Sequence, residues 1–151
     1  MSSTAETAKA LRTTLDAARA RMGTWTDAHA TEKWRGPGTW SRKEILGHLV
    51  DSAANNHQRF VRAAIDGEYA GPGYQQEDWN ATGCYQTFRW STLLTLWTSY
   101  NLLLAHVLEN LPAEKASAVC LIADNPPVIL QFLAEDYVAH MKHHLDQIFS
   151  S

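Results

Sequence analysis

The sequence predicts an all-α fold, a four-helix bundle of antiparallel helices joined by connections of moderate length. Ser-x-x-Glu capping boxes at Ser3 and Ser41 each precede residues that favour a helix. Between Thr87 and Leu111 the apolar residues recur at the three-and-four spacing of an amphipathic helix. No segment has the convincing alternation of a strand. A chain of 151 residues is long enough to bury one core, so we treat 1–151 as a single domain.

The first two helices are bounded by local signals. Ala8 to Met22 is rich in alanine, arginine and leucine, which favour helices. The connection from Thr24 to Gly38 contains threonines, tryptophans and a Pro-Gly turn. The second helix is predicted from about Arg42 to about Asp66, and Gly67 ends it.

The second half of the chain contains two more helices and two irregular connections. The connection from Gly67 to about Thr82 is unusually rich in aromatic and acidic residues. A third helix is predicted from about Thr87 to Leu111, where a proline follows. After a connection from Ala113 to Asn125, an Asn-Pro pair predicts the start of the fourth helix, which runs to about Phe149.

Composition excludes several classes of protein. The apolar fraction of 45% and charged fraction of 19% are typical of a globular chain. The net charge is −3, and no lysine or arginine block is present, so nucleic acid is not an expected partner. No apolar run predicts a membrane span or a signal peptide. Cys84 and Cys120 are far apart, so free thiols in the cytoplasm are the simplest interpretation, and one disulfide is the alternative.

A histidine cluster near the C-terminus predicts a metal site. His140 and His144 are four residues apart, so a helix places both imidazoles on one face, one turn apart. Such a pair is half of a transition-metal site. We predict His48 as the third ligand. The neighbouring His143 is the alternative member of the cluster, because pairs three apart can also share a ligand site.

The choice of His48 comes from counting about 100° per residue around each helix. With His48 at zero, an apolar arc from about 60° to 160° holds Ile45, Leu46, Leu49, Ala53 and Phe60. Asn55 and Arg59 lie beside His48, at about −20° and 20°, whereas His57 lies about 180° away. With His140 at zero, nearly the same arc on the fourth helix holds Leu130, Ala134, Tyr137, Val138, Met141 and Leu145.

On both helices, therefore, histidine lies where the apolar face meets its polar flank. If the two flanks face each other, the three imidazoles converge, as in other bundles that build metal sites. A structural role is the competing interpretation, because a histidine at such an edge is commonly packed and hydrogen-bonded. Asp51, Asp136 and Gln147 are the nearest candidates to orient the rings.

A substrate pocket is also predicted, lined by Tyr74, Trp79, Asn55 and Arg59. The connection that carries the two aromatic residues could fold over the metal end and supply apolar walls with a few polar groups. The alternative is that Tyr74 and Trp79 cap one end of the bundle.

Two motifs resemble the DinB/YfiT-like superfamily. The segment from Trp40 to Ser52 is similar to its second-helix signature, and the segment from His140 to Ile148 to its C-terminal signature. Tyr74 to Trp79 and Trp97 to Asn101 also resemble members of the group. The resemblance covers nearly the whole chain. It implies a four-helix bundle, usually a homodimer, with a divalent metal on three histidines that correspond to His48, His140 and His144.

Known activities of that superfamily differ, so the expected function is broad. Some relatives transfer or isomerise low-molecular-weight thiol conjugates, and others are induced by DNA damage. We therefore expect a metal-dependent transferase of the thiol S-transferase type, or a hydrolase, acting on a small molecule. The alternatives are a non-catalytic metal-binding stress or ligand-binding protein, and a purely structural bundle. Nitrogen and oxygen ligands favour zinc or nickel over iron or manganese. No individual residue is predicted as catalytic.

Overall fold

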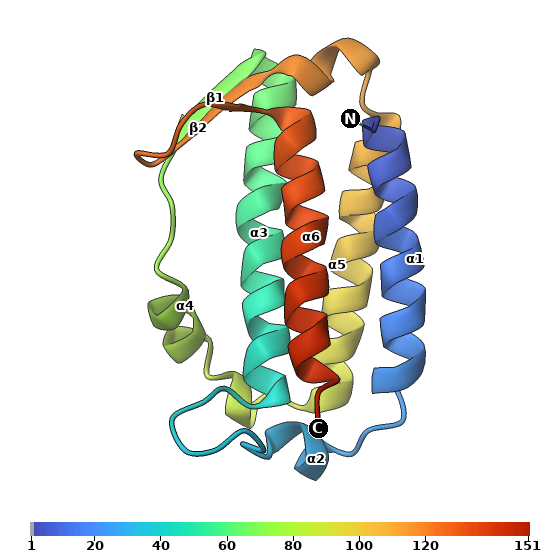
Figure 1. Ribbon diagram of the computed structural model, residues 1–151, viewed down its shortest axis with the longest axis vertical. Coiled ribbons are helices and arrows are strands. Elements are labelled where there is room, and N and C mark those ends of the chain that lie inside the picture. Colours follow the sequence, from blue (N-terminus) through green and yellow to red (C-terminus); the bar gives the residue numbers. More distant parts are fainter. Residues whose placement is uncertain (1) are drawn as a thin grey trace.

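Four long helices form a bundle in the computed structural model, which describes residues 2–151 (Figure 1). They are α1 (Thr4–Met22), α3 (Arg42–Asp66), α5 (Trp90–Asn110) and α6 (Leu130–Ile148). Each packs against two others, in the order α1, α5, α3, α6 and back to α1. This confirms the predicted four-helix bundle.

The four long helices run in two opposite directions, but the direction does not alternate strictly from one helix to its neighbour. Helices α1 and α6 run in one direction, and α3 and α5 in the other (Figure 1). The pairs α1–α5 and α3–α6 are therefore antiparallel, as predicted, whereas the neighbouring pairs α3–α5 and α1–α6 are parallel. Because α3 and α5 are consecutive long helices that run in the same direction, the connection between them must return along the whole bundle. That connection carries β1 (Glu68–Gly71) and α4 (Gln76–Gly83), within a segment predicted to be irregular.

Local signals explain why α3 begins and ends where the sequence predicts. Ser41 makes the complete capping box with Glu44, in which each side chain bonds the other residue's backbone N–H. Gly67 ends the helix at φ 78°, a left-handed conformation that suits glycine. At α1 only half of the box forms, because Ser3 accepts a bond from the Glu6 N–H and no return bond is present.

A small sheet covers one end of the bundle, where the sequence predicted no strand. Strand β1 pairs in parallel with β2 (Val119–Ile122), and β2 pairs antiparallel with β3 (Val128–Ile129). Strands of four and two residues are too short to display an alternating pattern.

The predicted start of the last helix at Asn125 is therefore wrong. The Asn125 N–H bonds to the carbonyl of Ile122, which makes the Asn-Pro pair part of the turn between β2 and β3. The observed N-cap is Ile129, four residues later, and helix α6 starts at Leu130.

The opposite end of the bundle is closed by α2 (Asp27–Thr31), a short helix inside the first predicted connection (Figure 1). Asp27 ties it to the long helices by accepting from Lys43 at 2.9 Å and from the Trp90 N–H at 2.9 Å. The 3₁₀ helices Tyr85–Thr87 and Ala113–Ser117 flank α5, which begins at Trp90 instead of Thr87.

The core is built by all four long helices, and its largest fully buried side chains include Trp97, Phe60 and Met22. Cys84 is exposed, Cys120 is buried, and both are free, as the simpler interpretation of the sequence required. Within residues 2–151, no helix combines the length and the apolar character needed to cross a bilayer.

Candidate metal centre

The three predicted histidines lie together between α3 and α6. The Nε2 atom of His48 is 3.3 Å from that of His140, which is 3.1 Å from that of His144. One nitrogen from each ring lies within 4.8 Å of the other two. The structure therefore brings together the same three rings that the angle count selected, each presenting Nε2 to a common point.

Burial keeps these imidazoles unprotonated at neutral pH. His48 is only 1% exposed, and burial, with the neighbouring His144 and His140, lowers its pKa to about 3. Burial is also the main reason that the pKa values of His140 and His144 are lowered. Asp136 partly opposes the change in the His140 pKa, and Gln147 partly opposes the change in the His144 pKa. Neutral rings have free nitrogen lone pairs, the state in which histidine binds a metal.

Gln147 orients one of the rings. Its Oε1 lies 2.9 Å from Nδ1 of His144, so it accepts the Nδ1 proton and leaves Nε2 of that ring free to face the other histidines. Of the three predicted orienting residues, Gln147 is the one bonded to a histidine of the cluster. Asp51 instead accepts a bond from Tyr85, and the exposed Asp136 acts on His140 through its charge.

The ring of His48 is fixed by packing. Trp40 lies against it, with ring centroids 5.3 Å apart. At the preceding residue, Gly47, the Tyr85 ring packs so tightly that an added Cβ would lie 2.2 Å from it. The Nδ1 atom of His48 is buried and has no hydrogen-bond partner among residues 2–151.

This donor set fits a divalent transition metal. In general, a catalytic zinc site has three protein ligands, such as three neutral imidazoles, and keeps a fourth position open; the three converging imidazoles here match that ligand set. The cluster contains neither thiolate nor carboxylate. This favours metals that accept nitrogen ligands, such as zinc, nickel or iron, over magnesium or calcium.

His57 and His143 lie outside the cluster. His57 points away, as predicted, and its Nδ1 lies 3.0 Å from the Tyr100 hydroxyl. His143 is exposed, and its nearest polar contact is Gln147 at 3.5 Å. In this structure, therefore, His143 does not take the place of His140 or His144 in the cluster, which was the alternative.

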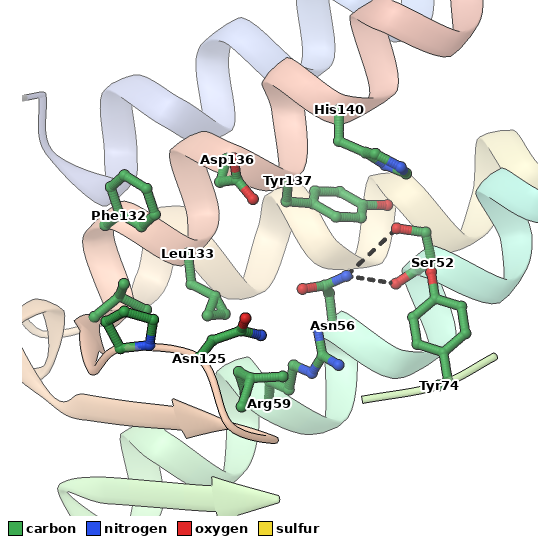
Figure 2. Close-up of a pocket in the computed structure, with 13 residues that line it drawn as sticks. Ser52, Asn56, Arg59, Tyr74, Asn125, Phe132, Leu133, Asp136, Tyr137 and His140 are labelled. Carbon is green, nitrogen blue, oxygen red and sulfur yellow. Dashed lines mark hydrogen bonds between the residues drawn. The ribbon is translucent and has the colours of Figure 1, made fainter. Parts of the chain in front are cut away.

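A cavity of about 320 Å³ opens beside His140, between α3 and α6 (Figure 2). Its polar wall residues are Ser52, Asn56, Arg59, Tyr74, Asn125, Asp136, Tyr137 and His140. Its apolar wall residues are Ile122, Pro126, Val128, Phe132 and Leu133. The volume is at the lower end of the range for small-molecule sites.

Two of the four predicted pocket residues, Arg59 and Tyr74, are in this wall, and Asn55 and Trp79 are not. Asn55 donates to the carbonyl of Asp51, and the next residue, Asn56, turns into the cavity instead. Trp79 packs edge-on against Tyr74 and is 43% exposed.

Sequence reasoning missed wall residues for two different reasons. Asn56 lies about 80° from His48, inside the arc counted as buried core, so the angle count contained the signal. Asn125 and Val128 reach the cavity only because the β2–β3 turn folds over it. That turn was expected to be the start of a helix.

A comparison with solved structures supports this fold. The chain matches YfiT from Bacillus subtilis, described as a probable metal-dependent hydrolase with an unusual four-helix bundle topology. The TM-score is 0.84 with 20% sequence identity, and the match covers 96% of this chain and 83% of YfiT. No family model matches the chain, and neither does any curated protein. The likeness confirms the YfiT-like fold that the two sequence motifs suggested.

Proposed function

We propose that this protein is a divalent-metal-dependent hydrolase of a small molecule that binds in the cavity beside His140. The observation that carries the proposal is the convergence of the Nε2 atoms of three neutral imidazoles at the edge of a cavity of ligand size. The description of YfiT, which shares the fold, supports the same class of reaction.

The protein's own residues would divide the work. His48, His140 and His144 hold the metal, and Gln147 keeps one ring in the required tautomer. A metal held in this way supplies Lewis-acid polarisation of a carbonyl and activates water at neutral pH. Asp136 is the carboxylate in the cavity wall, so it is the group placed to take a proton from the attacking water and pass it to the leaving group.

The choice of metal and the reaction type are proposals of the same kind. Zinc is our first choice, because three histidines with one open position are typical of its catalytic sites. Nickel is second, with iron and manganese after it. Transfer of a low-molecular-weight thiol is the competing reaction, since the open position would also accept a thiolate. A homodimeric, cytoplasmic protein remains our expectation.

The test measures hydrolysis and thiol transfer on the same zinc-loaded preparation, using panels of amides, esters and thiol acceptors. We expect the wild type to hydrolyse members of the panel. His140→Ala should abolish this activity, and Asp136→Asn should lower its rate about 100-fold or more. His57→Ala should leave the rate unchanged. Thiol conjugation without hydrolysis would replace the hydrolase by a transferase. Hydrolysis at equal rates with and without metal would overturn the proposed centre.

A further inference from the structure

The cavity has two chemically different ends. At one end lie His140 and Asp136, which are one helical turn apart on α6 and both line the cavity. At the other lies Arg59, whose guanidinium is 6.0 Å from the Tyr74 ring centroid and 3.4 Å from the Pro72 carbonyl. Figure 2 shows His140 and Arg59 on opposite sides of the cavity, with Asn56 between them. A ligand that fills the cavity therefore meets the metal site at one end and a cation at the other.

The guanidinium of Arg59 is available to a ligand. No carboxylate of residues 2–151 lies within ion-pair distance of it, whereas Arg12, on the outer surface, is paired with Glu109 at 2.8 Å. Its hydrogen bond to Pro72 is long and uses one of five N–H groups. A half-buried guanidinium with free donors in a cavity wall suits a carboxylate, which it can bind in a bidentate manner.

The middle of the cavity has one polar and one apolar wall. On α3, Asn56 is 8% exposed and donates to the Ser52 carbonyl at 2.8 Å, which leaves its own Oδ1 to accept from a ligand N–H. On α6, Phe132 and Leu133 face it with apolar surface (Figure 2). An amide N–H next to an apolar side chain complements this pair of walls.

The two ends of the cavity are set apart along α3. Residues 48 and 59 are separated by about 16 Å along the axis of α3, at 1.5 Å per residue. Side chains on a helix lean toward its N-terminus, so the Arg59 side chain extends back along α3 toward the histidine end of the cavity. Asp136 would offset part of the charge of a divalent metal at the His140 end, whereas no carboxylate among residues 2–151 offsets the charge of Arg59, so the Arg59 end is where a ligand carboxylate is expected.

We propose that the substrate is an N-acyl amino acid, with its carboxylate on Arg59, its amide N–H on Asn56 and its acyl carbonyl at the histidine end. This inference rests on the proposed hydrolase function and specifies its substrate class. In the reaction, the oxygen of water bonds to the acyl carbon and the C–N bond breaks. The proton released from the water goes to the departing nitrogen, so the products are a carboxylic acid and an amino acid.

The test is a binding measurement with two probes that differ in one charge, N-acetyl-L-leucine and N-acetyl-L-leucinamide. Calorimetric titration is carried out on zinc-loaded and metal-free protein. We expect the acid to bind at least about tenfold more tightly than the carboxamide, because the guanidinium recognises only the acid. Arg59→Gln should remove that preference, and Arg59→Lys should restore part of it. The matched control is Arg62→Gln, on the same helix but bonded to Gln58 away from the cavity.

Each remaining outcome decides against one proposal. Equal binding of the two probes to the wild type, or a preference that survives in Arg59→Gln, overturns the carboxylate site. A preference lost in metal-free protein but kept in Arg59→Gln places the carboxylate on the metal instead. A preference that depends on Arg59 in a protein without hydrolytic activity leaves the carboxylate site standing and removes the hydrolase. Thermal unfolding of each variant shows whether it is folded.

Discussion

The two ends of the cavity differ in how firmly the fold holds them. At the histidine end, His48 is 1% exposed and Gln147 bonds the His144 ring. At the other end, Arg59 is half-exposed and makes one long bond, to a backbone carbonyl. This difference in rigidity matches two different roles, metal binding and ligand recognition. Groups that must hold a metal are fixed before it binds, whereas a group that recognises a ligand keeps its donors free until the ligand arrives.

The firmness of the histidine end has an identifiable source in Arg42, at the start of α3. Its Nε donates to the Ile148 carbonyl at 2.9 Å, and its Nη2 to the Ser150 carbonyl at 3.2 Å. Trp34 covers the guanidinium, 3.8 Å from its ring centroid. The arginine thus ties the beginning of α3 to the end of α6, the two helices that contribute the histidines. Substitutions at the histidine end should therefore weaken metal binding and lower the free energy of unfolding. Substitutions at Arg59 should mainly weaken ligand binding.

The largest effect should come from removing a histidine of the cluster. In His48→Ala or His144→Ala, two imidazoles remain, and we expect stoichiometric divalent metal to be lost. His57→Ala is the matched control, because His57 lies on α3 but contacts Tyr100 instead. Elemental analysis of protein purified without a histidine tag gives the metal content.

His143→Ala tests the choice within the α6 cluster. It should keep the metal, since His143 is exposed and outside the group of converging nitrogens. Full metal content in both His48→Ala and His144→Ala would mean that the metal, if any, binds elsewhere.

The next effect tests the packing that supports His48. A methyl group at Gly47 would lie 2.2 Å from the Tyr85 ring, so Gly47→Ala should force that ring to move. We expect a loss of about 1–3 kcal/mol in the free energy of unfolding, the usual cost of overpacking, measured by urea denaturation. Gly73→Ala is the control, because its added Cβ meets only ordinary contact, 3.8 Å from Ala123. Equal stability of the two variants would mean that the histidine end is looser than its packing implies.

A smaller effect is expected at Gln147, which touches a ligand ring but not the metal. Gln147→Leu removes the acceptor for the His144 Nδ1 proton and should weaken metal binding about 10–100-fold. Gln147→Glu keeps an acceptor in that position and should retain most of the affinity. A competing chelator measures both. Unchanged affinity in Gln147→Leu would show that the ring is oriented by packing alone.

Part of this architecture could be predicted from the sequence because its signals are local. The bounds of α3 follow from a capping box at Ser41 and a glycine at position 67, both of which act within one helical turn. The positions of His48, His140 and His144 on their helices follow from the period of 3.6 residues alone. That the two histidine faces meet could be inferred, because apolar stripes must pack against each other.

The rest depends on contacts that are distant in sequence. Strand β2 exists because β1 lies beside it, and the two are separated by the whole of α4 and α5. The short strands have no periodicity of their own, so an Asn-Pro pair at 125 and 126 gave the wrong helix start. The same turn completes the cavity wall, and the returning connection places Tyr74 there. The wall was therefore less predictable than the metal ligands.

The last prediction concerns acidification, which should act on the histidine end of the cavity. The ordinary histidine pKa of 6.5 applies to the unfolded chain, whereas in the folded protein the pKa of His48 is about 3. Between these values the unfolded chain binds a proton that the folded protein does not. In metal-free protein, the contribution of His48 to the free energy of unfolding is therefore fully present above pH 6.5 and is lost as the pH decreases toward 3.

For His48 alone the expected loss is about 1.4 kcal/mol for each pH unit below the unfolded pKa. Urea denaturation of metal-free protein between about pH 7.5 and pH 5.5 measures the dependence before most carboxylates titrate. His48→Gln, which cannot take up the proton, should have a shallower dependence than the wild type. Equal slopes in the two proteins would mean that His48 is protonated in the folded state, and that burial does not hold the cluster ready for a metal.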